Sequence, residues 1–226
     1  MLIVPPVAKQ SVLDGAYARL RMQILRGEQV PGQRLKLDGL SEQLRVSINT
    51  LREILRRLVS EGLVEAVENK GFTVAPVSAG ELREITEVRC LLECEALGRS
   101  INNGDLDWEA RVIAAHYKLK RFEREMLDHD VSRAEVWEEH NHGLHDALIS
   151  ACNSPKLLSF QRAIYDQSLR YRMIAIRLSG STIKESSAEH ERLVKLSLDR
   201  SRDQAVALLR AHILRAAQTA NVDLLD

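Results

Sequence analysis

The sequence of 226 residues predicts a mainly α protein of two domains, and three observations support this prediction. Helical periodicity of apolar residues covers most of the chain. Strand-like alternation is confined to a short segment between residues 63 and 75, and a break containing Pro76 and Gly80 follows it. We therefore expect a first domain at residues 1–77 and an all-α helical bundle at residues 78–226.

The first domain is expected to begin with an amphipathic helix that ends near Gly27. Its apolar face is formed by Ala16, Leu20, Ile24 and Leu25. Pro31 and Gly32 then mark a turn. A short second helix follows, because Leu40 and Leu44 lie one helical turn apart.

A third helix starts after Ser47, whose hydroxyl can accept a hydrogen bond from a backbone N–H at the helix start. The apolar residues of this helix are Leu51, Ile54, Leu55 and Leu58. One face is therefore buried, and the opposite face carries Asn49, Arg52 and Arg56 among other polar residues. Two short helices joined by a tight turn predict a helix-turn-helix, with the third helix as the recognition helix.

A hairpin should follow, because residues 63–68 and 71–75 alternate on either side of a turn at Asn69-Lys70-Gly71. Three helices and this wing predict a winged helix-turn-helix, which binds DNA. We expect Arg45 and Arg52 to contact phosphates or base edges, and the wing tip to be formed by Lys70 and Gly71. The start of the recognition helix, which should face the groove, is formed by Ser47, Asn49 and Thr50.

The charge of the chain is uneven although its formal sum is zero. Residues 1–77 hold 11 Lys and Arg against 8 Asp and Glu, a net +3, and the remainder holds 21 against 24, a net −3. The basic excess lies in the domain expected to bind DNA, but it is too mild to establish a nucleic-acid partner by itself. Neither a signal peptide nor a membrane span is evident, so we expect a cytoplasmic protein.

The second domain contains six predicted helices, at residues 81–102, 107–127, 134–152, 155–179, 183–199 and 203–221. Six helices without strands indicate a helical bundle. In the first of them, Ile85, Val88, Leu92 and Leu97 are expected to face the core. Arg89 lies beside them, either as a paired or snorkelling residue or as a carboxylate binder. Cys90 and Cys94 are interpreted as small buried hydrophobic residues rather than a redox or metal site.

Three histidines lie on the apolar stripes of three different predicted helices: His145, His190 and His212. Asn141 precedes His145 by one helical turn, so both side chains project from one face. Neutral imidazoles from separate helices plus one oxygen donor suit Zn²⁺ or a neighbouring transition metal. The alternative is that each histidine is a hydrogen-bonded core residue. His142, three residues before His145, is a substitute ligand.

The chain resembles the GntR family of bacterial transcription regulators, in the FadR-type subfamily with a helical, ligand-sensing FCD-type domain. In the first domain the resemblance is carried by Pro31-Gly32, Leu51-Arg52-Glu53, Leu55-Arg56-Arg57-Leu58, Glu61-Gly62-Leu63-Val64 and Gly71-Phe72-Thr73-Val74. In the second it is carried by Val88-Arg89, Leu92-Glu93, Asn141 to His145, Glu189-His190 and His212.

The resemblance implies a homodimer that binds a near-palindromic DNA operator and responds to a small carboxylate metabolite. It implies that the metal ligands are Asn141, His145, His190 and His212. It further implies that Arg89, with Tyr171 and Arg172, contacts the effector. The expected metal is Zn²⁺, with Ni²⁺ or Mn²⁺ as alternatives.

This chain departs from the family pattern at several positions. The family usually has Asp where Asn141 stands, and an amide oxygen is a weaker, uncharged ligand. It also usually has Arg at Ile48, Pro at Thr50 and Gly at Arg45, so the operator cannot be carried over from other members.

We therefore predict a metabolite-responsive regulator, more specifically a repressor, that is not an enzyme. Two other interpretations stay open at this point. One is a helical metalloenzyme that uses the histidine cluster, which lacks an obvious general base because Asp146 and Glu189 fall on other faces. The other is the same regulator with a metal-free ligand cavity.

Overall fold

The computed structural model describes residues 12–68, 71–125, 133–179 and 182–219. The chain divides into two compact units, Met1–Pro76 and Val77–Asp226, each with its own secondary structure. The prediction of a mainly α protein with an N-terminal winged helix-turn-helix and a C-terminal helical bundle is confirmed.

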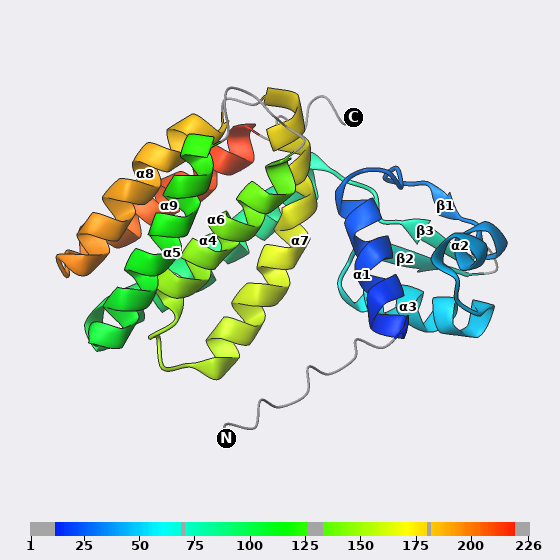
Figure 1. Ribbon diagram of the computed structural model, residues 1–226, viewed down its shortest axis with the longest axis horizontal. Coiled ribbons are helices and arrows are strands. Elements are labelled where there is room, and N and C mark those ends of the chain that lie inside the picture. Colours follow the sequence, from blue (N-terminus) through cyan, green and yellow to red (C-terminus); the bar gives the residue numbers. More distant parts are fainter. Residues whose placement is uncertain (1–11, 69–70, 126–132, 180–181, 220–226) are drawn as a thin grey trace, which may run out of the picture. The chain divides into compact units, whose positions relative to one another are not determined.

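The described residues of the first unit form three helices and a small sheet (Figure 1). The elements are α1 (Val12–Leu25), β1 (Arg34–Leu35), α2 (Leu37–Leu44), α3 (Ile48–Ser60), β2 (Val64–Val67) and β3 (Gly71–Val74). Its core is apolar and is formed by Leu20, Leu44, Leu51, Ile54, Leu55 and Leu58, each at most 1% exposed. The helical spacing of these residues in the sequence thus corresponds to one packed interior.

The sheet is antiparallel, with the strand order β1-β3-β2. Glu65 pairs with Thr73 and Val67 with Gly71, which gives the predicted wing. Strand β1 was not expected, because two residues are too few to show a period of two. It pairs Arg34 with Thr73, so β3 is the central strand.

The described residues of the second unit form a bundle of six helices, coloured from blue-green to red in Figure 1. They are α4 (Ala79–Asn103), α5 (Leu106–Glu125), α6 (Ala134–Ile149), α7 (Pro155–Ser179), α8 (Thr182–Leu198) and α9 (Arg202–Thr219). Helix α4 packs against α6, α7 and α9, and α5 packs against α6 and α8. Helices α4, α6, α8 and α9 can therefore direct side chains into one shared interior.

The expectation that Val88 faces the core is wrong, since it is 39% exposed. The inward face of α4 is instead continued by Arg89 and Glu93, which are both buried. The spacing of apolar residues predicts the buried face of such a helix wrongly, because a buried ion pair occupies positions where hydrophobic side chains are expected. Among the described residues, no helix combines the length and the apolar character that crossing a bilayer requires.

Candidate functional site

The start of α3 is fixed by hydrogen bonds between Ser47 and Thr50. The Ser47 hydroxyl accepts a hydrogen bond from the Thr50 backbone N–H at 3.1 Å, and the two side-chain hydroxyls lie 2.9 Å apart. Both were expected at the groove-facing start of this helix. In the structure their polar atoms are at least partly engaged with each other, so they cap and shape the helix that would present other residues to a base.

Asn49 and Arg52 are exposed on α3. Arg45 is also exposed and adopts the left-handed conformation (φ 57°, ψ 47°) that ends α2. A non-glycine residue is unfavourable there, because its Cβ crowds the backbone. Gly71 has a φ of +89° and begins β3 at the wing, whereas Lys70 lies outside the described residues.

Three histidines from three helices meet inside the second unit. One ring nitrogen each of His145 (α6), His190 (α8) and His212 (α9) lies within 4.8 Å of the other two. All three side chains are buried, and their ring centroids are 4.8 to 5.7 Å apart. The folded bundle therefore gathers imidazoles that are separated by up to 67 residues in the sequence (212 − 145 = 67).

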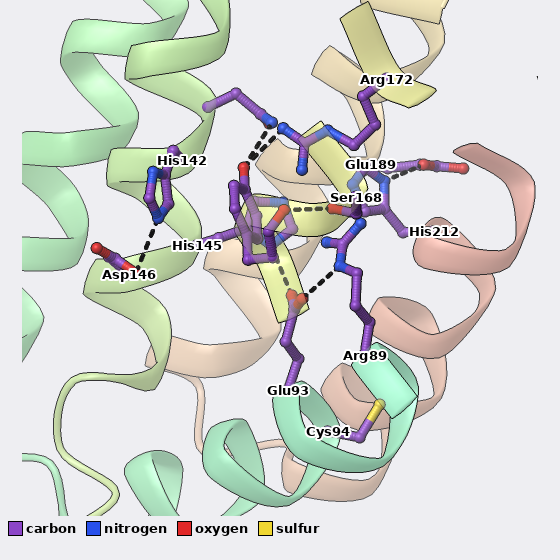
Figure 2. Close-up of polar contacts among 12 residues, drawn as sticks. Arg89, Glu93, Cys94, His142, His145, Asp146, Ser168, Arg172, Glu189 and His212 are labelled. Atoms are coloured by element: carbon purple, nitrogen blue, oxygen red, sulfur yellow. Dashed lines mark hydrogen bonds and ion pairs between the residues drawn. The ribbon is translucent and has the colours of Figure 1, made fainter. Parts of the chain in front are cut away.

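Two glutamates contact the outer nitrogens of two of these rings. The Nδ1 atom of His145 lies 3.3 Å from a carboxylate oxygen of Glu93, and Nδ1 of His212 lies 2.6 Å from one of Glu189. Figure 2 shows Glu93 between His145 and Arg89, and Glu189 beside His212. A carboxylate on Nδ1 fixes the ring so that its Nε2 is available to a metal, and it raises the basicity of that ligand.

The role of these glutamates was not found from the sequence. Glu189 was set aside because it lies on a different face of its helix from His190, yet it contacts His212 on the neighbouring helix α9. It also binds Arg215. The sequence offered one signal: Glu93 directly follows Leu92, and Glu189 directly precedes His190, and both neighbours were placed on apolar stripes. Only the packing of the helices brings each glutamate to its histidine.

Unpaired polar atoms lie among the candidate ligands. Neither ring nitrogen of His190 has a hydrogen-bond partner among the described residues, and the same holds for Oδ1 of Asn141. The Nδ2 group of Asn141 donates to Glu138 at 3.2 Å, which leaves the oxygen as the free end of the amide. A buried polar atom without a partner costs about 1–3 kcal/mol, so a bound ion would relieve a real penalty. Three imidazoles and one amide oxygen fit a divalent metal.

His190 and His212 are also in the charge state that a metal requires. Burial, together with the neighbouring His212 and His145, holds the pKa of His190 well below 6.5. Burial likewise lowers the pKa of His212 to about 4, although Glu189 opposes this shift. Both rings are therefore neutral at pH 7, with a nitrogen lone pair available to a metal.

A buried arginine, Arg89, and a partly buried one, Arg172, lie close to the histidines. Nε of Arg89 donates to Glu93 at 2.7 Å, and Arg172 pairs with Glu138 and donates to the Tyr165 hydroxyl at 2.7 Å. Both arginines border a small cavity that is also lined by Leu82, Thr86, Ser168, Tyr171, Ile213, Ala216 and Ala217. Burial and the nearby Arg89 guanidinium lower the pKa of Arg172.

Tyr171, expected near an effector, lines this cavity, while its hydroxyl accepts from the Ser78 backbone N–H and contacts Glu81. His142 is stacked on Tyr165 and lies 3.4 Å from Asp146. It is therefore engaged away from the three clustered histidines. Cys90 is buried and Cys94 is partly buried, and burial raises the pKa of both thiols, as expected for small packed residues.

A winged helix joined to a helical bundle is the architecture of a class of DNA-binding transcription regulators. Two family models divide the chain accordingly. Residues 13–74 match "Bacterial regulatory proteins, gntR family", and residues 84–215 match "FCD domain". The chain belongs to the GntR family of transcription regulators, in the group that carries an FCD domain, and it is not an enzyme.

Named relatives agree with this assignment. The chain is 35% identical to the HTH-type transcriptional regulator BphR of Paraburkholderia xenovorans (strain LB400), over 93% of this chain and 85% of the relative. It is 32% identical to the HTH-type transcriptional repressor GlaR of Escherichia coli (strain K12), over 89% and 92%. The solved structure of E. coli McbR/YncC shares the fold, with a TM-score of 0.77 at 21% identity over 95% of this chain and 99% of that one.

Proposed function

We propose that this regulator binds a divalent metal through His145, His190, His212 and Asn141, and that a small organic acid binding beside the metal controls its DNA binding. The observation that carries the proposal is the set of three buried histidines within 4.8 Å, combined with unpaired atoms on His190 and Asn141. A cluster that served only packing would be expected to have its buried nitrogens hydrogen-bonded.

Zn²⁺ suits this ligand set best, and Ni²⁺ or Mn²⁺ are alternatives. Imidazole nitrogen favours zinc and nickel, and one amide oxygen with an open position is compatible with all three ions. Asn141 contributes no negative charge. Glu93 and Glu189 compensate in part for this missing charge. Each carboxylate contacts the Nδ1 atom of a histidine ligand and thereby increases the basicity of that ligand.

The charges around the cluster favour an anionic ligand. Each buried or partly buried arginine near the histidines has a glutamate partner: Arg89 with Glu93, Arg172 with Glu138 and Arg215 with Glu189. These pairs sum to zero, and His190, His212 and Asn141 are neutral. A divalent metal would therefore add positive charge that none of its four ligands offsets, and when bound it would hold a ligand carboxylate. Arg172 is the group we expect to contact that acid from the cavity side.

The regulator is further proposed to be a repressor and a homodimer. The relative GlaR, at 32% identity, is named a repressor. A symmetric dimer carries two recognition helices related by a two-fold axis, so its operator should be near-palindromic, with half-sites about one helical turn apart or a multiple of that distance.

The proposal is tested by thermal unfolding of the full chain with a panel of short monocarboxylic and dicarboxylic acids, in Zn²⁺-loaded and chelator-treated forms. An acid at 100 times its dissociation constant stabilises the folded state by about 2.7 kcal/mol. We expect at least one acid to raise the melting temperature of the zinc-loaded protein and not of the chelated one.

A matched pair of variants locates the binding site. Arg172→Met should abolish the acid-dependent shift, whereas Arg162→Met, which changes an exposed arginine of the same helix, should retain it. Equal shifts with and without metal would support a metal-free cavity. The absence of a shift with any acid, in metal-loaded protein that binds zinc, would contradict the organic-acid part of the proposal.

A further inference from the structure

An isoleucine is exposed at the first position of the recognition helix. Ile48 is 39% exposed and is the first residue of α3, directly after the Ser47 cap. The other exposed large hydrophobic residues described in the first unit, Val12 and Val30, lie outside α3. Single exposed hydrophobic residues are common, so exposure alone says little about Ile48. Its position at the start of the recognition helix is the informative observation.

The neighbours of Ile48 place it on the surface expected to meet DNA. Asn49 is the next residue, and Arg52 lies one helical turn further along the same side of the helix; both are exposed. In helix-turn-helix proteins the N-terminal residues of the recognition helix contact base edges in the major groove. The hydroxyls of Ser47 and Thr50 contact each other, so Ile48, Asn49 and Arg52 are the side chains most available to bases at this end.

The chemistry of isoleucine restricts what it can recognise in that groove. The 5-methyl group of thymine is the one bulky apolar group that the bases present there. Apart from the small C–H groups of cytosine and the purines, the major-groove edges carry hydrogen-bond donors and acceptors. Isoleucine against those groups would remove water from them without supplying a partner. Its β-branched side chain is also stiff, so ordering it against a methyl group costs little entropy.

We propose that Ile48 recognises a thymine in each operator half-site by apolar contact with the 5-methyl group. The inference uses the DNA-binding function of the first unit and does not depend on the metal or on the acid. It predicts that the identity of one base pair is read by a methyl contact rather than by a hydrogen bond.

The test begins with selection of binding sites from a randomised double-stranded DNA pool, using the full-length protein. Each thymine of the selected half-site is then replaced in turn by deoxyuridine, which lacks only the methyl group. Affinities are measured by fluorescence anisotropy at one salt concentration, because phosphate contacts make them salt-dependent. We expect one position per half-site at which deoxyuridine weakens wild-type binding about fourfold, the factor expected for one methyl group taken from water.

The variants assign that effect to Ile48. Ile48→Ala should bind the thymine and deoxyuridine duplexes equally, and Ile48→Val, which keeps a branched side chain, should retain most of the difference. Circular dichroism and thermal unfolding check that both variants fold. The proposal is overturned if no deoxyuridine substitution affects wild-type binding, or if Ile48→Ala keeps the wild-type sensitivity. The wild-type series alone can overturn it even if the alanine variant does not fold.

Discussion

Replacement of Arg89 by methionine tests the buried ion pair that supports His145. Nε of Arg89 lies 2.7 Å from Glu93, and the two side chains are 6% and 1% exposed. Removing one partner of a buried pair typically costs about 3–5 kcal/mol, because the remaining charge has no partner. Glu93 still contacts His145 at 3.3 Å, so we expect a loss in free energy of unfolding near the lower limit, about 3 kcal/mol.

The double variant Arg89→Met with Glu93→Gln separates the ion pair from packing. The glutamine removes the stranded charge and still offers an oxygen to His145. We therefore expect the double variant to recover about 2 kcal/mol relative to Arg89→Met.

Urea unfolding followed by tryptophan fluorescence suits this measurement, because both tryptophans of the chain, Trp108 and Trp137, lie in the helical unit. A single variant as stable as the wild type, or a double variant no more stable than the single one, would refute the reasoning.

The pH dependence follows from the same pair. In the wild type, burial raises the pKa of Glu93, but Arg89 and His145 more than offset this and hold it well below 4.5. The stability that Glu93 contributes is therefore present above pH 4.5 and is lost as the pH falls through its folded pKa. Without Arg89 burial dominates and the pKa rises, so the penalty of Arg89→Met should shrink as the pH falls from 7 toward 5. A penalty that is constant over this range would contradict an unpaired charge.

Four further predictions concern the two units separately. Arg52→Ala should weaken operator binding by about 1–3 kcal/mol in a gel-shift titration at fixed salt, the scale of a bidentate base contact, and unchanged affinity would count against that role. Arg45→Gly should raise the unfolding free energy by about 1 kcal/mol, because glycine tolerates φ 57° without strain; a less stable variant would argue against strain at this turn. Glu189→Gln should reduce zinc affinity about 10- to 100-fold. The control Glu191→Gln, which changes an exposed glutamate on the same helix, should leave zinc affinity unchanged. Equal affinities of the two variants would show that Glu189 does not support the metal site. Burial and Glu61 raise the pKa of Tyr17 to about 12. The stability that Tyr17 contributes is therefore complete below pH 10 and is lost as the pH rises through 12. A difference titration of the wild type against Tyr17→Phe that shows a group titrating near pH 10 would contradict this.

Much of the fold could be predicted because its elements are long and strongly periodic. The helix predicted at residues 155–179 has the same bounds in the structure, and the hairpin was predicted from its turn and its alternation. Strand β1 was missed because its two residues depend on pairing with β3 rather than on local pattern. Val88 was misplaced because Arg89 and Glu93 take the buried face of α4.

The candidate metal site could be predicted only in part. His145, His190 and His212 were singled out because each interrupts an apolar stripe, and a buried polar residue on such a stripe is conspicuous in a sequence. Glu93, Glu138 and Glu189 were not, since acidic residues are common on helix surfaces. Their roles depend on which neighbouring helix each one faces, and helix packing is a property of the whole bundle rather than of a local segment.

The central claim is that the three histidines and Asn141 hold one divalent metal ion. The most direct measurement is the zinc content of purified protein by elemental analysis, after loading with Zn²⁺ and removal of free metal by desalting. We predict one zinc ion per chain for the wild type and a large loss in His190→Ala. The control is His116→Ala, which changes a partly buried histidine outside the cluster. A wild type without bound zinc, or a His190→Ala variant with undiminished content, would contradict the account.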